Sequence, residues 1–304
     1  MTLADQDPEP RVGIQALLDE GVHVAPDLAS ASGTSAIENP RIAGRDRRPA
    51  ISRLFGSLVR TRVGRRFLFA LLDDPATLSW MLHRLSNRGA ATARFEPRLE
   101  PEGPGARGFE DCFWLFSSNA LNHGLTRLEF DEGAYLFRLV RSLGEPRAAE
   151  IGRFRGGTTY LLALAGAHVV SVDLDLARQE RFSVELASAL KRAGLREQVE
   201  IVIADSGSYP VAPESFDLVF VDGDHSYEGA RADFDHWWPA LRPGGHLLFH
   251  DAVFAPHDSR LAVAEGVVRL ARELETDERV ERRPAPGSLA HFVKPTADAG
   301  GQDT

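Results

Sequence analysis

The sequence predicts a doubly wound, Rossmann-like α/β sheet, mostly parallel, that is preceded by a helical extension. Short apolar runs alternate with segments of helical periodicity over the second half of the chain. A glycine-rich turn follows the first of these runs, and the later runs mostly end at an acidic residue. Strands that alternate with helices pair in parallel, because each crossover helix returns the chain to the same edge of the sheet.

The composition is typical of a soluble globular protein. The chain has 304 residues, of which 43% are hydrophobic and 26% charged, and its net charge is −9. We expect no nucleic-acid partner, because phosphate contacts require a basic face. A single cysteine, Cys112, excludes an internal disulfide and a cysteine-based zinc site. The sequence lacks an apolar run of transmembrane length and a signal-peptide pattern, which predicts a cytoplasmic protein.

Three regions of the chain differ in pattern. Residues 1–48 mix Pro, Gly, Ser and charges without sustained periodicity, so we expect a disordered tail apart from a short helix at Val12–Asp19. Residues 49–125 are predicted to form a helical extension and a linker. Residues 126–304 are predicted to form the α/β domain.

The extension contains an arginine-rich stretch. Residues 41–70 hold nine Arg and one acidic residue, Asp46, within a chain whose remainder is acidic. Apolar residues at helical spacing follow Ile51, and Asp74-Pro75 begins a second helix. We interpret the arginines as a solvated face of these helices. Contact with an anionic membrane or an acidic partner is the alternative.

Aromatic and helical segments lead into the first strand of the domain. Exposure of the run Phe113–Phe116 to water would be costly, so we expect it to pack against the domain. A helix is predicted at Glu132–Leu143 and ends at Gly144. The apolar residues up to Ile151 then predict a buried strand.

The remaining elements alternate as the predicted fold requires. Strands are expected at His168–Val172, Val199–Ala204, Phe216–Val221 and His246–Phe249, helices at Tyr160–Ala165, Leu176–Ala193 and Tyr227–Leu241, and an antiparallel hairpin at Val280–Arg283 and Ala290–Val293. Trp237 and Trp238 are predicted to lie in the core. The segment Ala252–Leu261 is predicted to be a loop that forms a substrate wall.

The turn Glu150–Thr159 connects the first strand to its helix. Glycines at positions 152, 156 and 157 allow a ligand to approach the backbone, where the helix amino end presents N–H groups. Glu150 would repel a pyrophosphate, and the spacing differs from the dinucleotide pattern, which favours a nucleoside without phosphates. A plain strand–helix turn without a ligand is the alternative.

The form E-x-G-x-x-x-G resembles the first motif of the class I S-adenosylmethionine-dependent methyltransferases. The resemblance implies that Glu150 and Gly152 meet the methionine part of the cofactor, with Gly156 in the same binding turn. It assigns Asp173, 21 positions after Gly152, to the ribose hydroxyls. It places Asp205-Ser206 near the adenine, although a turn role for Asp205 is equally open.

Three later segments are more specific. The run Asp222–Gly229, with Leu241–Gly245 and Phe249–Asp251, resembles a bacterial family of small class I enzymes, methyltransferase family 24. That family is related to metal-dependent O-methyltransferases of natural-product pathways. The resemblance covers about residues 126–295 and includes the antiparallel hairpin at the end of the sheet.

The same resemblance implies a metal site. By similarity with catechol O-methyltransferase, Asp222 and Asp251 match two metal-binding aspartates, and carboxylate oxygens at adjacent strand ends can hold Mg²⁺. Ala252 stands where the third ligand, an Asn, would be. A substitute such as His250 or Asp224 is therefore needed, or there is no metal. His250 could equally be a hydrogen-bonding group for the substrate.

His225 lies three residues after Asp222, where the similar enzyme carries its lysine base. A neutral imidazole has a pKa suited to proton abstraction near pH 7. With Asp222 it forms the predicted catalytic pair. The alternative is a structural histidine at the start of a helix.

The sequence thus predicts a methyltransferase that uses S-adenosylmethionine to methylate a hydroxyl of a small molecule or sugar. The alternative is a non-catalytic cofactor-binding protein, or one that interacts with a membrane or partner, on the same fold. The glycine spacing disfavours an NAD-dependent dehydrogenase, and the negative charge disfavours nucleic-acid methylation. The acceptor and the oligomeric state, including a homo-oligomer, stay open.

Overall fold

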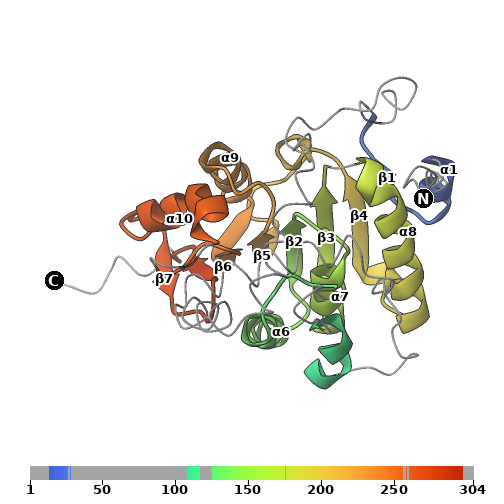
Figure 1. Ribbon diagram of the computed structural model, residues 1–304, viewed down its shortest axis with the longest axis horizontal. Helices are drawn as coiled ribbons and strands as arrows, with labels where there is room; N and C mark the ends of the chain where they lie inside the picture. The colour runs from blue at the N-terminus through green and yellow to red at the C-terminus, as the bar shows by residue number, and fades with distance from the viewer. Residues whose placement is uncertain are drawn as a thin grey trace, which may run out of the picture.

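An eight-stranded sheet lies at the centre of the fold (Figure 1). The computed structural model describes residues 14–26, 28, 108–116, 125–174, 176–255, 258 and 260–296. The strand order is β1-β4-β3-β2-β5-β6-β8-β7. The strands are β1 (His23–Val24), β2 (Arg147–Ile151), β3 (His168–Asp173), β4 (Val199–Ile203), β5 (Phe216–Val221), β6 (Leu241–Phe249), β7 (Glu281–Arg283) and β8 (Ala290–Val293).

The sheet is parallel from β1 to β6 and antiparallel at its other edge. β8 pairs antiparallel with β6, and β7 pairs antiparallel with β8. These pairings confirm the predicted mostly parallel α/β sheet with a carboxyl-terminal hairpin. β6 starts at Leu241, earlier than expected, because its first residue already pairs with Phe216 before a register shift in the ladder.

Helices cover both faces of the sheet. They are α1 (Ile14–Asp19), α6 (Phe130–Leu143), α7 (Gly157–Leu164), α8 (Leu176–Ala193), α9 (Tyr227–Trp237) and α10 (Leu261–Leu274), with 3-10 turns η1 (Phe109–Phe116), η2 (Arg196–Gln198) and η3 (Ser206–Ser208). Buried residues of α1, α6, α7 and α8 share one core, and those of α9 and α10 share the other. Successive side chains of β2 lie on opposite faces of the sheet, so Ala148 packs in the first core and Ala149 in the second.

Helix ends follow the local signals in the sequence. The bounds of α8 agree with the prediction, and it ends before Gly194, whose φ is +74°. α6 begins two residues earlier than predicted, because a capping box between Glu129 and Glu132 satisfies its first backbone groups. Trp237 is fully buried and Trp238 nearly so, which confirms their place in the core.

Residues 14–24 form two elements. α1 confirms the short helix expected at Val12–Asp19, whereas β1 corrects the prediction of a disordered tail for the residues that follow it. β1 extends the sheet beside β4, and α1 packs on α8 with Leu17 fully buried. Arg196 fixes this segment, since its Nη2 donates to the carbonyl oxygens of Glu20 at 2.7 Å and Gly21 at 3.0 Å. A two-residue strand is too short to produce a periodic signal in the sequence.

The predicted extension mostly lies outside the described residues. This holds for the arginine-rich residues 41–70 and for both predicted helices. In η1, Leu115 is buried and the ring of Phe116 contacts the rings of Phe109 and Phe130, so these parts of the aromatic run do pack against α6. The side chains of Phe113 and Trp114 lie outside the description.

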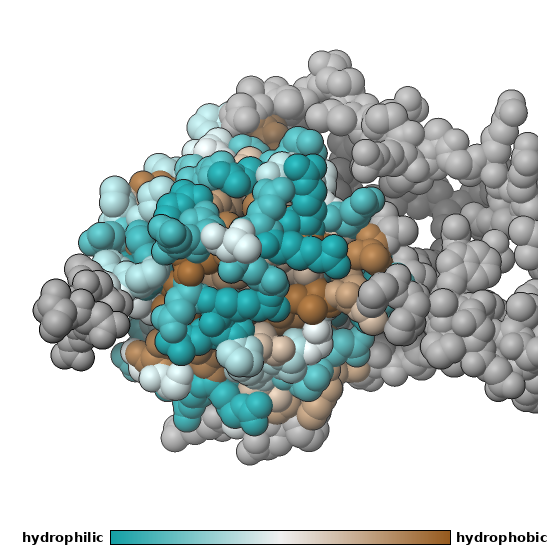
Figure 2. All heavy atoms as spheres, turned by 90° about the vertical axis from the view of Figure 1, so that its left-hand side faces the viewer, coloured by the Kyte–Doolittle hydropathy of each residue, from teal (hydrophilic) through white to brown (hydrophobic). Residues whose placement is uncertain are grey.

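The helix α10 was not predicted from the sequence. It packs on α9 so closely that a Cβ on Gly266 would lie 2.2 Å from the backbone nitrogen of Tyr227. Its outer side is mainly hydrophilic, as Figure 2 shows for the face that carries α10 and β7. Among the described residues, no helix is both long and apolar enough to cross a membrane.

Candidate active site

The glycines of the turn after β2 are required by packing within the protein. Gly152 has φ +87°, and a Cβ there would lie 2.2 Å from the carbonyl oxygen of Asp222. Gly156 has φ +84°, and its Cβ would lie 2.7 Å from the side chain of Leu186 on α8. The pattern therefore has a structural cause, while a role for either glycine in cofactor binding stays a prediction.

Glu150 lies in the core beneath this turn. Its Oε2 accepts hydrogen bonds from the hydroxyls of Thr159 and Ser171, each at 2.5 Å, and the residue is fully buried. Burial raises the pKa of Glu150 to about 7, although the two hydroxyls and the nearby Arg153 act in the opposite direction. Its other oxygen, Oε1, is buried without a hydrogen-bond partner among the described residues, and the contact of Glu150 with the methionine part of a cofactor stays a prediction.

Asp173 closes the turn onto the end of β3. Its Oδ2 accepts hydrogen bonds from the backbone nitrogens of Arg153 at 2.9 Å and Phe154 at 3.1 Å. Phe154 has φ +51°, so the turn is tightly wound at this point. Asp173 is only partly buried at the carboxyl end of its strand, where a ligand of a parallel sheet binds. Its predicted contact with a ribose is compatible with this position.

Arg153 is a residue of the turn for which the sequence analysis assigned no role. Only 2% of it is exposed, and its Nη1 donates to the carbonyl oxygens of Ser171 at 2.6 Å and Val202 at 3.1 Å. Its Nη2 donates to the hydroxyl of Ser183 at 3.1 Å. The arginine thus ties the turn to β3, β4 and α8. No periodic signal could have identified it, because an Arg in a turn is normally exposed.

The residues predicted near the adenine lie beside an unexpected buried carboxyl group. Asp205 is exposed, whereas the hydroxyl of Ser206 donates to Oδ1 of Asp233 at 2.5 Å. Asp233 lies on α9 with 5% exposed, and burial raises its pKa to about 6. Ser206 already has a protein partner, so its contact with an adenine stays a prediction.

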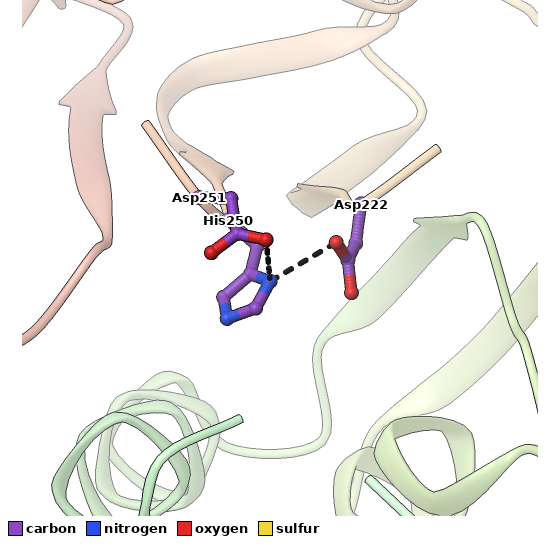
Figure 3. A group of neighbouring side chains, drawn as sticks. All are labelled: Asp222, His250 and Asp251. Atoms are coloured by element: carbon purple, nitrogen blue, oxygen red, sulfur yellow. Dashed lines mark hydrogen bonds and ion pairs between the residues drawn. The ribbon is translucent and has the colours of Figure 1, made fainter. Parts of the chain in front are cut away.

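Two carboxylates and one imidazole converge where β5 and β6 end (Figure 3). Asp222 follows β5, and His250 and Asp251 follow β6, so the parallel pairing of the two strands brings these residues to one edge. One side-chain ligand atom of each lies within 4.8 Å of the others. The structure therefore brings together the predicted metal-binding residues. We call this group, with His225, the histidine–carboxylate cluster.

The atoms of the cluster face one another at short range. His250 Nδ1 lies 3.0 Å from Asp222 Oδ1 and 3.8 Å from Asp251 Oδ2. His225 Nε2 lies 3.5 Å from the same Asp222 oxygen and 3.9 Å from the same Asp251 oxygen. That nitrogen is buried and has no hydrogen-bond partner among the described residues. Asp251 has φ +52°, a tight turn that brings its side chain back toward β5.

Glu132 of α6 supports the cluster from behind and was not predicted as a site residue. It is fully buried, and its Oε2 lies 3.3 Å from His250 Nε2. Its Oε1 accepts hydrogen bonds from the backbone nitrogen of Ser288 at 2.6 Å and from the Ser288 hydroxyl at 2.8 Å. Its sequence position indicates only the first turn of a helix, and the contact to His250 spans 118 positions.

The charges in the cluster stabilise one another. Burial alone would raise the pKa of Asp222, but His250 and His225 hold it well below its usual range. Burial alone would lower the pKa of His250, but Asp222 and Glu132 raise it well above the ordinary value. The carboxylate of Asp222, 3.5 Å from the ring, raises the pKa of His225. The carboxyl groups of Asp222 and Glu132 are thus both ionised near neutral pH.

The donor set fits a divalent cation. Ionised carboxylates of Asp222 and Asp251 are suitable ligands, and His250 can add a nitrogen. Asp224 does not lie in this group, and its Oδ1 and Oδ2 accept hydrogen bonds from the nitrogen and hydroxyl of Ser226 at the start of α9. Ala252 is buried and offers no side-chain ligand. Of the substitutes considered from the sequence, only His250 joins the cluster.

A family model matches the part of the chain that carries this site. Residues 149–252 match the family model of a methyltransferase domain. The match confirms the resemblance to methyltransferase family 24 and covers about a third of the chain. The matched range extends from β2 to the turn after β6, and it contains the whole histidine–carboxylate cluster. Glu132 and Ser288 lie outside the matched range.

Curated relatives match short stretches. An uncharacterized protein of Sinorhizobium fredii, y4gI, is 43% identical over 47 residues, which are 16% of this chain and 5% of that protein. An uncharacterized protein of Acanthamoeba polyphaga mimivirus, R132, is 28% identical over 109 residues, which are 34% of this chain and 49% of that protein. The chain therefore spans about half of R132 and a small part of y4gI.

Solved structures of methyltransferases resemble the fold. The O-methyltransferase TomG from Streptomyces achromogenes, involved in tomaymycin synthesis, is 22% identical with a TM-score of 0.44, and the match covers 57% of this chain and 83% of that one. An O-methyltransferase from Bacillus cereus is 19% identical with a TM-score of 0.46, and the match covers 70% of this chain and 100% of that one. Scores this low do not establish a shared activity.

Proposed function

We propose that this methyltransferase domain transfers a methyl group from S-adenosylmethionine to a hydroxyl oxygen of a small molecule or sugar. The observation that carries the proposal is the histidine–carboxylate cluster beside the turn of the matched domain. The backbone of Asp222 lies directly against Gly152 of that turn. A cofactor over the turn and an acceptor over the cluster would therefore be neighbours, as direct transfer requires.

The buried nitrogen of His225 supports an acid–base role. Its Nε2 is without a hydrogen-bond partner in the described part of the chain and faces two carboxylates. In the proposed reaction it accepts the proton of the acceptor hydroxyl. The acceptor oxygen then forms a bond to the methyl carbon while the carbon–sulfur bond breaks, and the electron pair stays on sulfur. Asp222 stabilises the imidazolium that results.

A divalent cation, which the resemblance implies to be Mg²⁺, belongs to the same proposal. Asp222, Asp251 and His250 would hold it, and it would supply a Lewis acid that lowers the pKa of a nearby hydroxyl. Loss of methyl transfer on treatment with a chelator, and its return with added metal, is the expected result. Full activity in the presence of the chelator would contradict the metal requirement.

Calorimetry with S-adenosylmethionine tests the cofactor. We expect binding by the full chain, and affinity at least about tenfold weaker after Asp173→Asn, because a neutral amide accepts hydrogen bonds from ribose less strongly. Asp235→Asn, at an exposed position on α9, is the matched control. Since Asp173 also binds the turn, circular dichroism must show that the variant is folded. Absence of binding by the wild type would refute the proposal.

Turnover tests the catalytic base. His225→Ala should reduce methyl transfer by about 100-fold or more while leaving the affinity for S-adenosylmethionine unchanged. Normal turnover would remove His225 as the base. Cofactor binding without turnover on a broad panel of hydroxyl acceptors would favour the non-catalytic alternative. The arginine-rich residues 41–70, on which a membrane or partner role would depend, lie outside the described residues.

A further inference from the structure

We propose that the histidine–carboxylate cluster selects a divalent first-row transition metal, such as Mn²⁺, Co²⁺ or Zn²⁺, over Mg²⁺. In this proposal His250 is a nitrogen ligand, and Glu132 is the positioning residue that holds its ring. The inference rests on the metal in the proposed function and specifies its class. It departs from the all-oxygen ligand set that the sequence resemblance implies.

The first argument is the kind of atom that the chain offers. Asp222 and Asp251 supply oxygen, but the position of the missing amide is Ala252, which is buried and has no ligand atom. His250 supplies an imidazole nitrogen in its place. Mg²⁺ is bound in proteins almost entirely by oxygen, whereas imidazole suits zinc, copper, iron and nickel. Replacing an amide oxygen by a nitrogen therefore shifts the preference toward transition metals.

The second argument is the spacing of the donors. His250 Nδ1 and Asp222 Oδ1 are 3.0 Å apart. Two ligands about 2.1 Å from one ion and roughly at right angles are about 3 Å apart, which is the spacing found here. Asp251 Oδ2, 3.8 Å from the same nitrogen, needs only a small side-chain rotation to join them. Figure 3 shows Nδ1 of the ring turned toward both carboxylates.

The third argument is the contact behind the ring. Glu132 Oε2 lies 3.3 Å from His250 Nε2, where a carboxylate oxygen can accept a hydrogen bond from the N–H of the ring. The neutral ring that binds a metal then carries its proton on Nε2 and presents the lone pair of Nδ1 to the cluster. Hydrogen bonds from the backbone nitrogens of Glu129 and Ser288 and from the Ser288 hydroxyl fix Glu132. The carboxylate is thus a rigid support for one tautomer.

A second pair of neighbouring histidines in the described part of the chain, His246 and His291, has no such arrangement. His246 Nδ1 lies 2.8 Å from His291 Nε2, and His291 Nδ1 lies 2.7 Å from the hydroxyl of Tyr135. These rings bind each other and a phenol, with no carboxylate on either side in those contacts. The carboxylate–histidine–carboxylate order around His250 therefore distinguishes it from His291, the other buried histidine among the described residues.

Cobalt spectroscopy tests the proposal without any need for turnover. The full chain is stripped of metal with a chelator, dialysed and titrated with Co²⁺, whose visible absorption reports nitrogen ligation. We expect one strongly bound Co²⁺ per chain, and about a 100-fold molar excess of Mg²⁺ should leave most of the signal in place. No saturable Co²⁺ binding, or displacement by equimolar Mg²⁺, would overturn the proposal and leave His250 as a charged bridge between Glu132 and Asp222.

Variants assign the two residues. His250→Asn restores an amide oxygen and should weaken Co²⁺ binding about 100-fold while sparing Mg²⁺, and Glu132→Gln should weaken it about 10- to 100-fold. His168→Asn, at an exposed position on β3, is the control for adventitious binding. An unchanged Co²⁺ spectrum in His250→Asn would overturn the nitrogen ligand. If Glu132→Gln does not fold, Glu132→Asp, which keeps the charge but shortens the reach, replaces it.

The outcome is separable from that of the proposed function. Co²⁺ binding requires neither S-adenosylmethionine nor an acceptor. Failure of the cofactor calorimetry with intact Co²⁺ binding would refute the methyltransferase activity and retain the metal class. If the protein binds S-adenosylmethionine but its metal site prefers Mg²⁺, the proposed cofactor is retained and the transition-metal class is refuted.

Discussion

Replacing Glu150 with Gln should make the protein less sensitive to rising pH. In the folded state burial raises the pKa of this carboxyl group from 4.5 to about 7. The folded protein therefore binds the proton more tightly than the unfolded chain does. This contribution to stability is complete below the unfolded value and is lost as the pH rises from 4.5 through 7.

The size of the effect follows from the same shift. Relative to a group that never ionises, Glu150 lowers the unfolding free energy by about 3 kcal/mol at pH 8, where it is ionised in both states. At pH 5 the reduction is only about 1 kcal/mol, because the group is protonated in the folded state and only the unfolded chain ionises. Relative to Glu150→Gln, the wild type should thus lose about 2 kcal/mol of unfolding free energy between these two pH values. The amide keeps an acceptor for Thr159 and Ser171, so the hydrogen bonds survive.

Denaturant unfolding at both pH values measures this difference. For each protein, the unfolding free energy at pH 5 is compared with that at pH 8. The difference between the two values does not contain the cost of fitting an amide into the site, because that cost is the same at both pH values. Glu265→Gln, at an exposed position on α10, is the matched control and should leave the pH dependence unchanged. Parallel pH profiles for the wild type and Glu150→Gln would refute the reasoning.

Two further substitutions test the packing and the electrostatics. Gly152→Ala should lower the unfolding free energy by about 3 kcal/mol or more in denaturant unfolding, because its Cβ would overlap the carbonyl of Asp222. Gly194→Ala is the control, since it also has positive φ but open space around it, and it should cost about 1 kcal/mol. Equal costs for the two substitutions would contradict the packing argument. Burial, with His246 and Arg283, lowers the pKa of His291 from 6.5 to about 4. The contribution of the neutral ring to the unfolding free energy is therefore complete above pH 6.5 and is lost as the pH falls through 4. His291→Gln should remove about 3 kcal/mol of that pH dependence, and an unchanged loss of stability on acidification would count against it.

Local patterns were sufficient for the elements that follow a clear period. The apolar runs of β5 and β8 and the helix α8 agree with the predicted bounds. They do so because one buried strand or one amphipathic helix leaves its full signal within its own residues. The parallel order of strands then placed Asp222 and Asp251 at one edge, so the acidic half of the cluster followed from topology alone.

Other features needed contacts between distant residues. The glycines of the turn were attributed to ligand approach, whereas the space beside Gly152 and Gly156 is taken up by Asp222 and Leu186. The edge strand β1 is too short to be periodic, and its pairing with β4 defines it. α10 was not predicted, although its buried apolar residues share a core with those of α9, because the segment before it has the composition of a loop.

The sequence by itself determined the α/β sheet, the order of its central elements and the residues that stand at the strand ends. Only the tertiary structure decided which of those residues meet and what supports them. Glu132 and His250 are 118 positions apart, yet one buried carboxylate fixes the ring of the other residue. Periodicity describes which side of an element is buried, whereas such a contact depends on how two elements pack, and no single segment carries that information.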